Sequence, residues 1–168
     1  MSRSLDQLFE STYATLRQIA GRHLERPGGN GAISATEVVH ECYLKLLSAS
    51  HLDGFDQRQF LALAARALRQ VLVDHARATQ RLKRGDAWRR ITLHSGLTAR
   101  QADVDVLALH DALGRLEKLN ARQAQIVEMR YFSGLSIDES AAVLDVSART
   151  VDGDWQMARA WLKRELTK

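Results

Sequence analysis

Apolar residues recur every three to four positions along most of the chain, a spacing that places them on one face of an α-helix. Three stretches in the first half show this pattern, and each predicts an amphipathic helix. The apolar positions are Leu5, Leu8, Phe9, Tyr13, Leu16 and Ile19 in the first, Val38, Val39, Cys42, Tyr43, Leu46 and Leu47 in the second, and Phe60, Leu63, Ala64, Ala67, Leu68, Val71 and Leu72 in the third. We expect these helices to form a bundle.

The helical spacing stops in the middle of the chain and then returns. Residues 88–104 mix Thr, Ser, Gly and short apolar runs without a sustained period, and no strand-like alternation competes with the helical patterns. Helical apolar positions return at Val106, Leu109, Leu113, Leu116, Ile126, Val127 and Tyr131. The sequence therefore predicts an all-α fold of two small helical domains, residues 1–90 and 105–168, joined by a linker at 91–104.

Local signals mark where helices end and begin. The single proline, Pro27, lies among three glycines at 26–31, which predicts a loop that ends the first helix. Ser34 or Thr36 can cap the second helix, because a hydroxyl oxygen accepts a free N–H group of the first turn.

Residues 135–151 have the pattern of a helix-turn-helix. Ser136 followed by Glu139 is a capping box that fixes the start of the first helix. Asp145 falls at the turn, where a left-handed backbone is needed and Asp is tolerated. Ser147 then caps the second helix.

The second helix of this motif has two distinct faces. Its apolar positions, which we expect in the core, are Val151, Trp155, Ala158 and Leu162. The opposite face, which would be offered to a major groove, carries Arg149, Asp152, Gly153, Gln156 and Arg159. Capped helical pairs are also common as purely structural hairpins, and this pattern alone leaves that alternative open.

Charge strengthens the nucleic-acid interpretation. The 168 residues are 45% hydrophobic, enough for packed cores, and carry a formal net charge of +4. Much of the excess is clustered at Arg77, Arg81, Lys83, Arg84, Arg89 and Arg90. Such a cluster favours a polyanionic partner, with nucleic acid first, although it could also be a solvated helix end.

Other function classes have little support. Cys42 is the only cysteine, and the six histidines include no pair at ligand spacing on a shared helix face, so we expect no metal site and no cofactor. Asp74 beside His75 has neither a nucleophile nor a glycine-rich phosphate loop with it, so we expect no enzymatic activity. No apolar segment is long enough to span a membrane, and we expect a cytoplasmic protein with a buried, structural Cys42.

Two separated stretches resemble bacterial sigma factors of the extracytoplasmic-function (ECF) class, within the sigma-70 family, and an ECF-like subgroup of that class. The matching segments are residues 36–46, 60–66 and 73–77 in the first half and 119–123, 130–136, 150–155 and 158–162 in the second. They cover most of the chain in the order and spacing of the family. This match is far more specific than a lone helix-turn-helix.

The resemblance implies an alternative sigma factor that directs promoter-specific transcription initiation by RNA polymerase core. The first domain would be sigma domain 2, which grips the clamp coiled coil of the β′ subunit and melts the −10 element. The second would be sigma domain 4, which docks on the β-flap and reads the −35 element. By motif position, the helix at 34–47 implies polymerase contacts through Glu37, Glu41 and Lys45.

The resemblance also implies which residues meet promoter DNA. In the first domain the contact falls to the turn at 52–59 and the helix that follows. The residues that could hold phosphates or the unstacked strand there are Arg58, Gln59, Arg66, Arg69 and Arg77. In the second domain the candidates are Arg149, Asp152, Gln156 and Arg159, with Asp152 accepting from a cytosine amine.

The sequence departs from the family in two places. Many relatives have several carboxylates at the start of the second helix, where this chain has Ser34, Ala35, Thr36 and Glu37. Phosphorylation of Thr36 or Ser34 by a Ser/Thr kinase would supply the missing charge, and the alternative is that both residues simply cap the helix. Asp152 and Gly153 stand where relatives commonly have basic residues, which predicts weaker −35 binding.

Two other functions are alternatives to a sigma factor. A stand-alone helix-turn-helix transcription regulator would bind duplex DNA without polymerase, whereas a sigma factor with Asp152 and Asp154 on its reading helix would bind DNA weakly alone. A regulatory protein that sequesters polymerase without initiating transcription is the third class. Besides polymerase core and promoter DNA, an anti-sigma factor or a kinase is the regulatory partner to expect.

Overall fold

The structure is a computed structural model that describes residues 4–24, 33–48, 52–81, 90–93 and 102–168. These residues form seven helices and two short strands, which confirms the all-α fold class. The first three helices, here called the N-terminal bundle, are α1 (Leu5–Leu24), α2 (Ala35–Leu47) and α3 (Gln57–Arg81). The other four, called the C-terminal bundle, are α4 (Val106–Leu119), α5 (Ala121–Phe132), α6 (Ile137–Leu144) and α7 (Ala148–Leu166).

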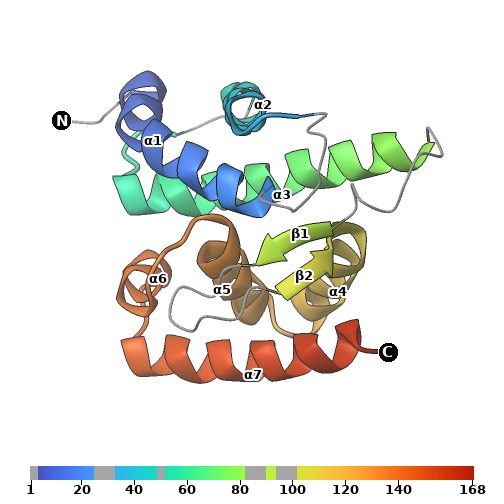
Figure 1. The fold of residues 1–168 in the computed structure, drawn as a ribbon. Helices are drawn as coiled ribbons and strands as arrows, with labels where there is room; N and C mark the ends of the chain where they lie inside the picture. Colours follow the sequence, from blue (N-terminus) through green and yellow to red (C-terminus); the bar gives the residue numbers. More distant parts are fainter. Residues whose placement is uncertain (1–3, 25–32, 49–51, 82–89, 94–101) are drawn as a thin grey trace.

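Helix α3 is the central layer of the molecule (Figure 1). Helices α1 and α2 pack on one side of α3, and α4, α5 and α6 pack on the other. Helix α7 lies across the far side of the C-terminal bundle, against α4, α5 and α6. Because α3 is rich in alanine and is apolar over much of its circumference, neighbours can approach it from both sides, and the two bundles share one continuous hydrophobic core.

The region predicted to be a linker contains a small antiparallel pair of strands. Strands β1 (Arg90–Leu93) and β2 (Ala102–Asp105) pair with Arg90 opposite Asp105 and Leu93 opposite Ala102. The sequence showed no strand-like alternation here, so these strands were not expected. A strand of four residues is too short for its alternation to stand out, and it is stabilised by hydrogen bonds to a partner distant in the sequence.

The helix-turn-helix prediction is confirmed in its local chemistry. The Ser136 side chain accepts from the Glu139 N–H and the Glu139 side chain accepts from the Ser136 N–H, which completes the capping box of α6. Asp145 has φ 53° and ψ 48°, the left-handed conformation expected of the turn. The Ser147 side chain accepts from the Thr150 N–H and caps α7.

Most predicted core positions are buried or half-buried, and Leu47 is exposed. Cys42 and the apolar face of α7, including Val151 and Trp155, are buried as expected. Leu47 was predicted to join the core of the second helix, yet it is 52% exposed. It lies in the last turn of α2, and its partner on the same face, Leu44, is also exposed.

Gly153 is an unfavourable residue in the middle of a helix. It lies in α7, and a Cβ atom added there would meet nothing within 4 Å. We expect Gly153→Ala to raise the free energy of unfolding by about 0.5–1 kcal/mol, because alanine loses less backbone entropy on helix formation. Urea denaturation followed by circular dichroism measures this, and Gly134→Ala is the opposite control because Gly134 has φ +68°. An unchanged or lower stability of Gly153→Ala would contradict the prediction.

Candidate functional surfaces

The outward face of α2 combines acidic and apolar side chains. Glu37, Glu41 and Leu44 follow one another at spacings of four and three, which places them on one side of the helix, and Leu47 continues this side. Leu44 is 63% exposed, while Val38, Val39, Cys42 and Leu46 form the buried side against α1 and α3. The sequence predicted a role for the two carboxylates but not for the two leucines, because Leu47 was assigned to the core and Leu44 was not singled out.

Ser34 is the N-cap of this helix, and Thr36 is not. The Ser34 Oγ accepts from the Glu37 N–H at 3.2 Å, and the Ser34 N–H donates to Glu37 Oε2 at 2.6 Å. The Ser34 backbone bond, with help from the side chain, lowers the pKa of the exposed Glu37 carboxyl. Thr36 is the second residue of α2. It is half-exposed and takes no part in the capping box.

The other two predicted polymerase-binding residues are held by α3. His75 Nε2 lies 2.9 Å from Glu41 Oε1, and Lys45 Nζ lies 3.0 Å from Asp74 Oδ2. Burial raises the pKa of Asp74, but hydrogen bonds from Lys45 and Gln70 outweigh it and leave the pKa below its usual value. These contacts fix α2 on α3 and limit how Glu41 and Lys45 can be presented to a partner.

The promoter candidates at the start of α3 are accessible. Arg58 and Gln59 are exposed. Gln59 also forms a capping box with Asp56, since the Asp56 N–H donates to Gln59 Oε1 at 2.9 Å and the Gln59 N–H donates to Asp56 Oδ1 at 2.8 Å. Arg77, near the other end of the helix, is exposed as well.

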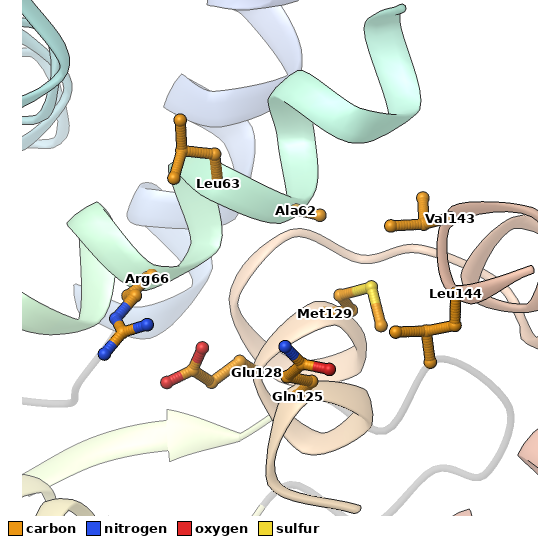
Figure 2. A pocket seen from close by; sticks show the side chains of 8 residues that line it. All are labelled: Ala62, Leu63, Arg66, Gln125, Glu128, Met129, Val143 and Leu144. Atoms are coloured by element: carbon orange, nitrogen blue, oxygen red, sulfur yellow. The ribbon is translucent and has the colours of Figure 1, made fainter. Parts of the chain in front are cut away.

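The two central promoter candidates differ in exposure, since Arg66 is exposed beside the C-terminal bundle and Arg69 is buried against it. The Arg69 Nη2 atom is paired with Glu128 Oε1 of α5, and both side chains are largely buried, with 10% and 15% exposed. Burial lowers the pKa of Arg69 and raises that of Glu128. Figure 2 shows Arg66 and Glu128 at one end of a cavity of about 190 Å³, whose other lining residues are Ala62, Leu63, Gln125, Met129, Val143 and Leu144.

Helix α7 presents the face that was predicted to meet a major groove. All five predicted residues on that face, Arg149, Asp152, Gly153, Gln156 and Arg159, are exposed. Gln156 Nε2 donates to Asp152 Oδ2 at 3.0 Å, so these two candidates form one polar unit. Met157 also protrudes from this helix.

Trp155 supports this face from beneath. The guanidinium carbons of Arg130 and Arg159 lie 5.0 Å and 5.5 Å from the Trp155 ring centroid, within the range of cation–π attraction. The Tyr131 ring meets the Trp155 ring edge-on at 5.2 Å between centroids. The buried indole therefore holds Arg159, one of the predicted DNA contacts, in place.

Asp154 does not belong to the reading face. It is buried, and its carboxylate accepts from Arg122 Nε at 2.6 Å and from Gln123 Nε2 at 3.1 Å. The prediction that Asp154 adds to the acidity of the reading helix was therefore wrong. Its partners lie on α5, and no local pattern in α7 could have indicated them.

Among the described residues, no helix has both the length and the apolarity to cross a membrane.

A search of curated proteins found no match. Among solved structures, the chain is similar to CnrH, whose structure was determined in complex with the cytosolic domain of CnrY, at 23% sequence identity and a TM-score of 0.43. The alignment covers 97% of this chain and 87% of CnrH.

The family assignment rests on the sequence as a whole. A profile of the family described as ECF sigma factor matches residues 2–168. This match confirms the resemblance that the separated segments of the sequence indicated. The chain belongs to the ECF sigma factor family, whose members bind RNA polymerase core and promoter DNA and direct transcription initiation.

Proposed function

We propose that this sigma factor docks on the clamp coiled coil of the polymerase β′ subunit through the outward face of α2. The observation that carries this proposal is the outward stripe of α2, in which Glu37 and Glu41 are followed by the exposed Leu44 and Leu47. Exposed leucines next to carboxylates suit a protein partner, since they combine apolar contact area with charges that can select a basic surface. Lys45 contributes at the edge of this stripe.

In this proposal residues 1–90 act as sigma domain 2 and residues 105–168 as sigma domain 4. The first meets the −10 element through the turn at 52–59 and α3, and the second docks on the β-flap and meets the −35 element through α7. The exposed Arg149 and Arg159 supply positive charge on α7. The bond between Gln156 and Asp152 leaves fewer free donors on the same face, which supports the prediction of weak −35 binding.

We also propose that a phosphate on Thr36 strengthens polymerase docking, with Ser34 the less favourable acceptor. The Ser34 hydroxyl already caps α2, whereas Thr36 lies half-exposed beside Glu37. A phosphate there would add a charge of about −1.5 to −2 to a docking face that has few carboxylates. A Ser/Thr kinase and an anti-sigma factor remain predicted regulators, and the cytoplasm, where polymerase works, is the proposed location.

The test is binding to RNA polymerase core from which sigma factors have been removed. We expect wild-type protein to bind and the Glu37→Ala/Glu41→Ala variant to bind about tenfold or more weakly, because truncating charged contacts in an interface costs roughly 1–3 kcal/mol. Glu10→Ala/Asp138→Ala is the matched control, since both of these carboxylates are exposed and lie outside α2. Binding gained only with Thr36→Glu would support gating by phosphorylation.

Other outcomes point to the competing functions. Failure of every variant to bind core, together with specific duplex DNA binding, would indicate a stand-alone transcription regulator. Core binding without promoter melting would indicate a protein that sequesters polymerase.

A further inference from the structure

Asp154 is a charged residue on the buried side of α7, the helix that is proposed to read the −35 element. It is 8% exposed and lies next to Trp155 among the apolar residues of that side. Both of its carboxylate oxygens are used, since Oδ2 accepts from Arg122 Nε at 2.6 Å and Oδ1 accepts from Gln123 Nε2 at 3.1 Å. These bonds join the N-terminal half of α7 to the first turn of α5.

The first turn of α5 is itself well anchored. The Asn120 side chain caps this helix and accepts from the Gln123 N–H at 3.1 Å, and Gln123 is buried. Arg122 reaches Asp154 from the surface, with 45% of its side chain exposed. The carboxylate of Asp154 therefore connects α7 to a helix start whose position is set by its own cap.

Packing of α7 on α5 does not require a carboxylate at this position. Apolar residues of similar volume in place of a buried ion pair are often equally or more stabilising, because burying a charge removes its hydration. Apolar contacts also depend little on direction, so they restrict the rotation of α7 about its own axis less than hydrogen bonds do. The two bonds to Asp154 are therefore better suited to fixing this rotation than to adding stability.

The rotation of α7 affects every residue on its outward face. The candidate DNA contacts on this face, all exposed, are Arg149, Asp152, Gln156 and Arg159. Side-chain tips lie about 5–6 Å from the axis of a helix, so a rotation of about 20° would move them by roughly 2 Å. Hydrogen bonds to base edges tolerate only a few tenths of an ångström. A small change in rotation would therefore misalign these residues together.

We propose that Asp154 is a positioning residue for −35 recognition, which fixes the rotation of α7 through Arg122 and Gln123 and so aims the outward face of α7 at the bases. This inference rests on the proposed function, in which α7 reads the −35 element. Asp154 itself touches no DNA in this role. Loss of its bonds should reduce the discrimination between −35 sequences while polymerase core binding is kept.

The test is promoter selection by holoenzyme reconstituted from the full chain and RNA polymerase core. The templates are a DNA pool randomised upstream of the start site, each with a transcribed barcode that identifies it by sequencing. The preference ratio is the transcription from templates with favoured −35 sequences divided by that from templates with the same −10 sequence and an average −35 sequence. We expect this ratio to be about fivefold or more lower for Asp154→Asn than for wild type, the effect of losing at least one base contact.

Leu162→Ala is the matched control for a purely structural effect. Leu162 is 4% exposed on the same helix, so this variant should lose stability through a cavity while its preference ratio stays unchanged. Arg122→Ala removes the bond from the α5 side and should lower the ratio as Asp154→Asn does. The Arg122→Ala/Asp154→Asn double variant should resemble Asp154→Asn alone, because both changes act on the same contact. Urea denaturation and core binding are measured for each variant.

The outcomes separate this inference from the proposed function. A wild type that discriminates between −35 sequences and a folded Asp154→Asn variant with the same preference ratio would overturn the positioning role alone. An equal fall of the ratio in Leu162→Ala would also overturn it, since lost stability would then account for the effect. If Asp154→Asn does not fold, the ratio of Arg122→Ala decides in the same way. A wild type that binds core but transcribes independently of the −35 sequence would overturn the proposed role of α7, and this inference with it.

Discussion

Replacing Trp155 with alanine should lower the free energy of unfolding by about 3–5 kcal/mol, the usual cost of deleting a buried indole. Trp155 is 5% exposed in α7 and contacts Tyr131, Arg130 and Arg159. Its loss would open a cavity under the helix-turn-helix and remove the aromatic surface that positions both guanidinium groups. Guanidinium denaturation followed by circular dichroism measures the change.

Trp161→Ala is the matched control, because it deletes the same side chain at a half-exposed position of the same helix. We expect a clearly smaller loss of stability there. Trp155→Phe keeps an aromatic ring and should recover part of the loss. If Trp155→Ala and Trp161→Ala lowered the free energy of unfolding equally, the prediction that Trp155 contributes more to core packing would be wrong.

Native Cys42 should react with Ellman's reagent about a thousandfold more slowly than an accessible thiol at pH 8. Burial, with a smaller contribution from the Glu41 charge, raises the pKa of the Cys42 thiol from 9.0 to about 12, and Lys45 only partly opposes this. Only the thiolate attacks, and each unit of pKa lowers its fraction about tenfold at this pH. The rate should therefore keep rising with pH up to the raised pKa.

The comparison thiol comes from a Cys42→Ala/Gln18→Cys variant, since Gln18 is exposed on α1. Wild-type protein in denaturant should react at a rate close to that of this variant. If the reaction rate of native Cys42 lay within about tenfold of the rate of the exposed thiol, the predicted protection of Cys42 by burial would be wrong.

Features set by neighbours in the sequence were predictable. The caps at Ser136 and Ser147 and the left-handed Asp145 depend on residues within one helical turn, and each was found as expected. The same holds for the buried faces of the long helices, where the apolar period is sustained. Of the two candidate caps of the second helix, the structure selects Ser34, because its partner Glu37 lies at the third helical position.

Features set by distant partners were not predictable. Arg69 and Asp154 follow the pattern of exposed helical residues, but Glu128 pairs with the first, and Arg122 and Gln123 with the second, all from α5. Leu47 fits the apolar period of its helix and yet faces outward beside Leu44, because α1 and α3 cover only one side of α2. The spacing of apolar residues shows that a helix has an apolar face. Which side chains become buried depends on where the neighbouring helices pack.

The central position of α3 has a consequence for how the chain unfolds. Its apolar residues, such as Phe60 and Leu68, belong to the core shared by both bundles, so neither bundle can lose its structure without exposing part of this helix. The backbone amides in the middle of α3 should therefore be the slowest in the described chain to exchange with solvent deuterium. One helix thereby couples the folding of both halves into a single cooperative unit.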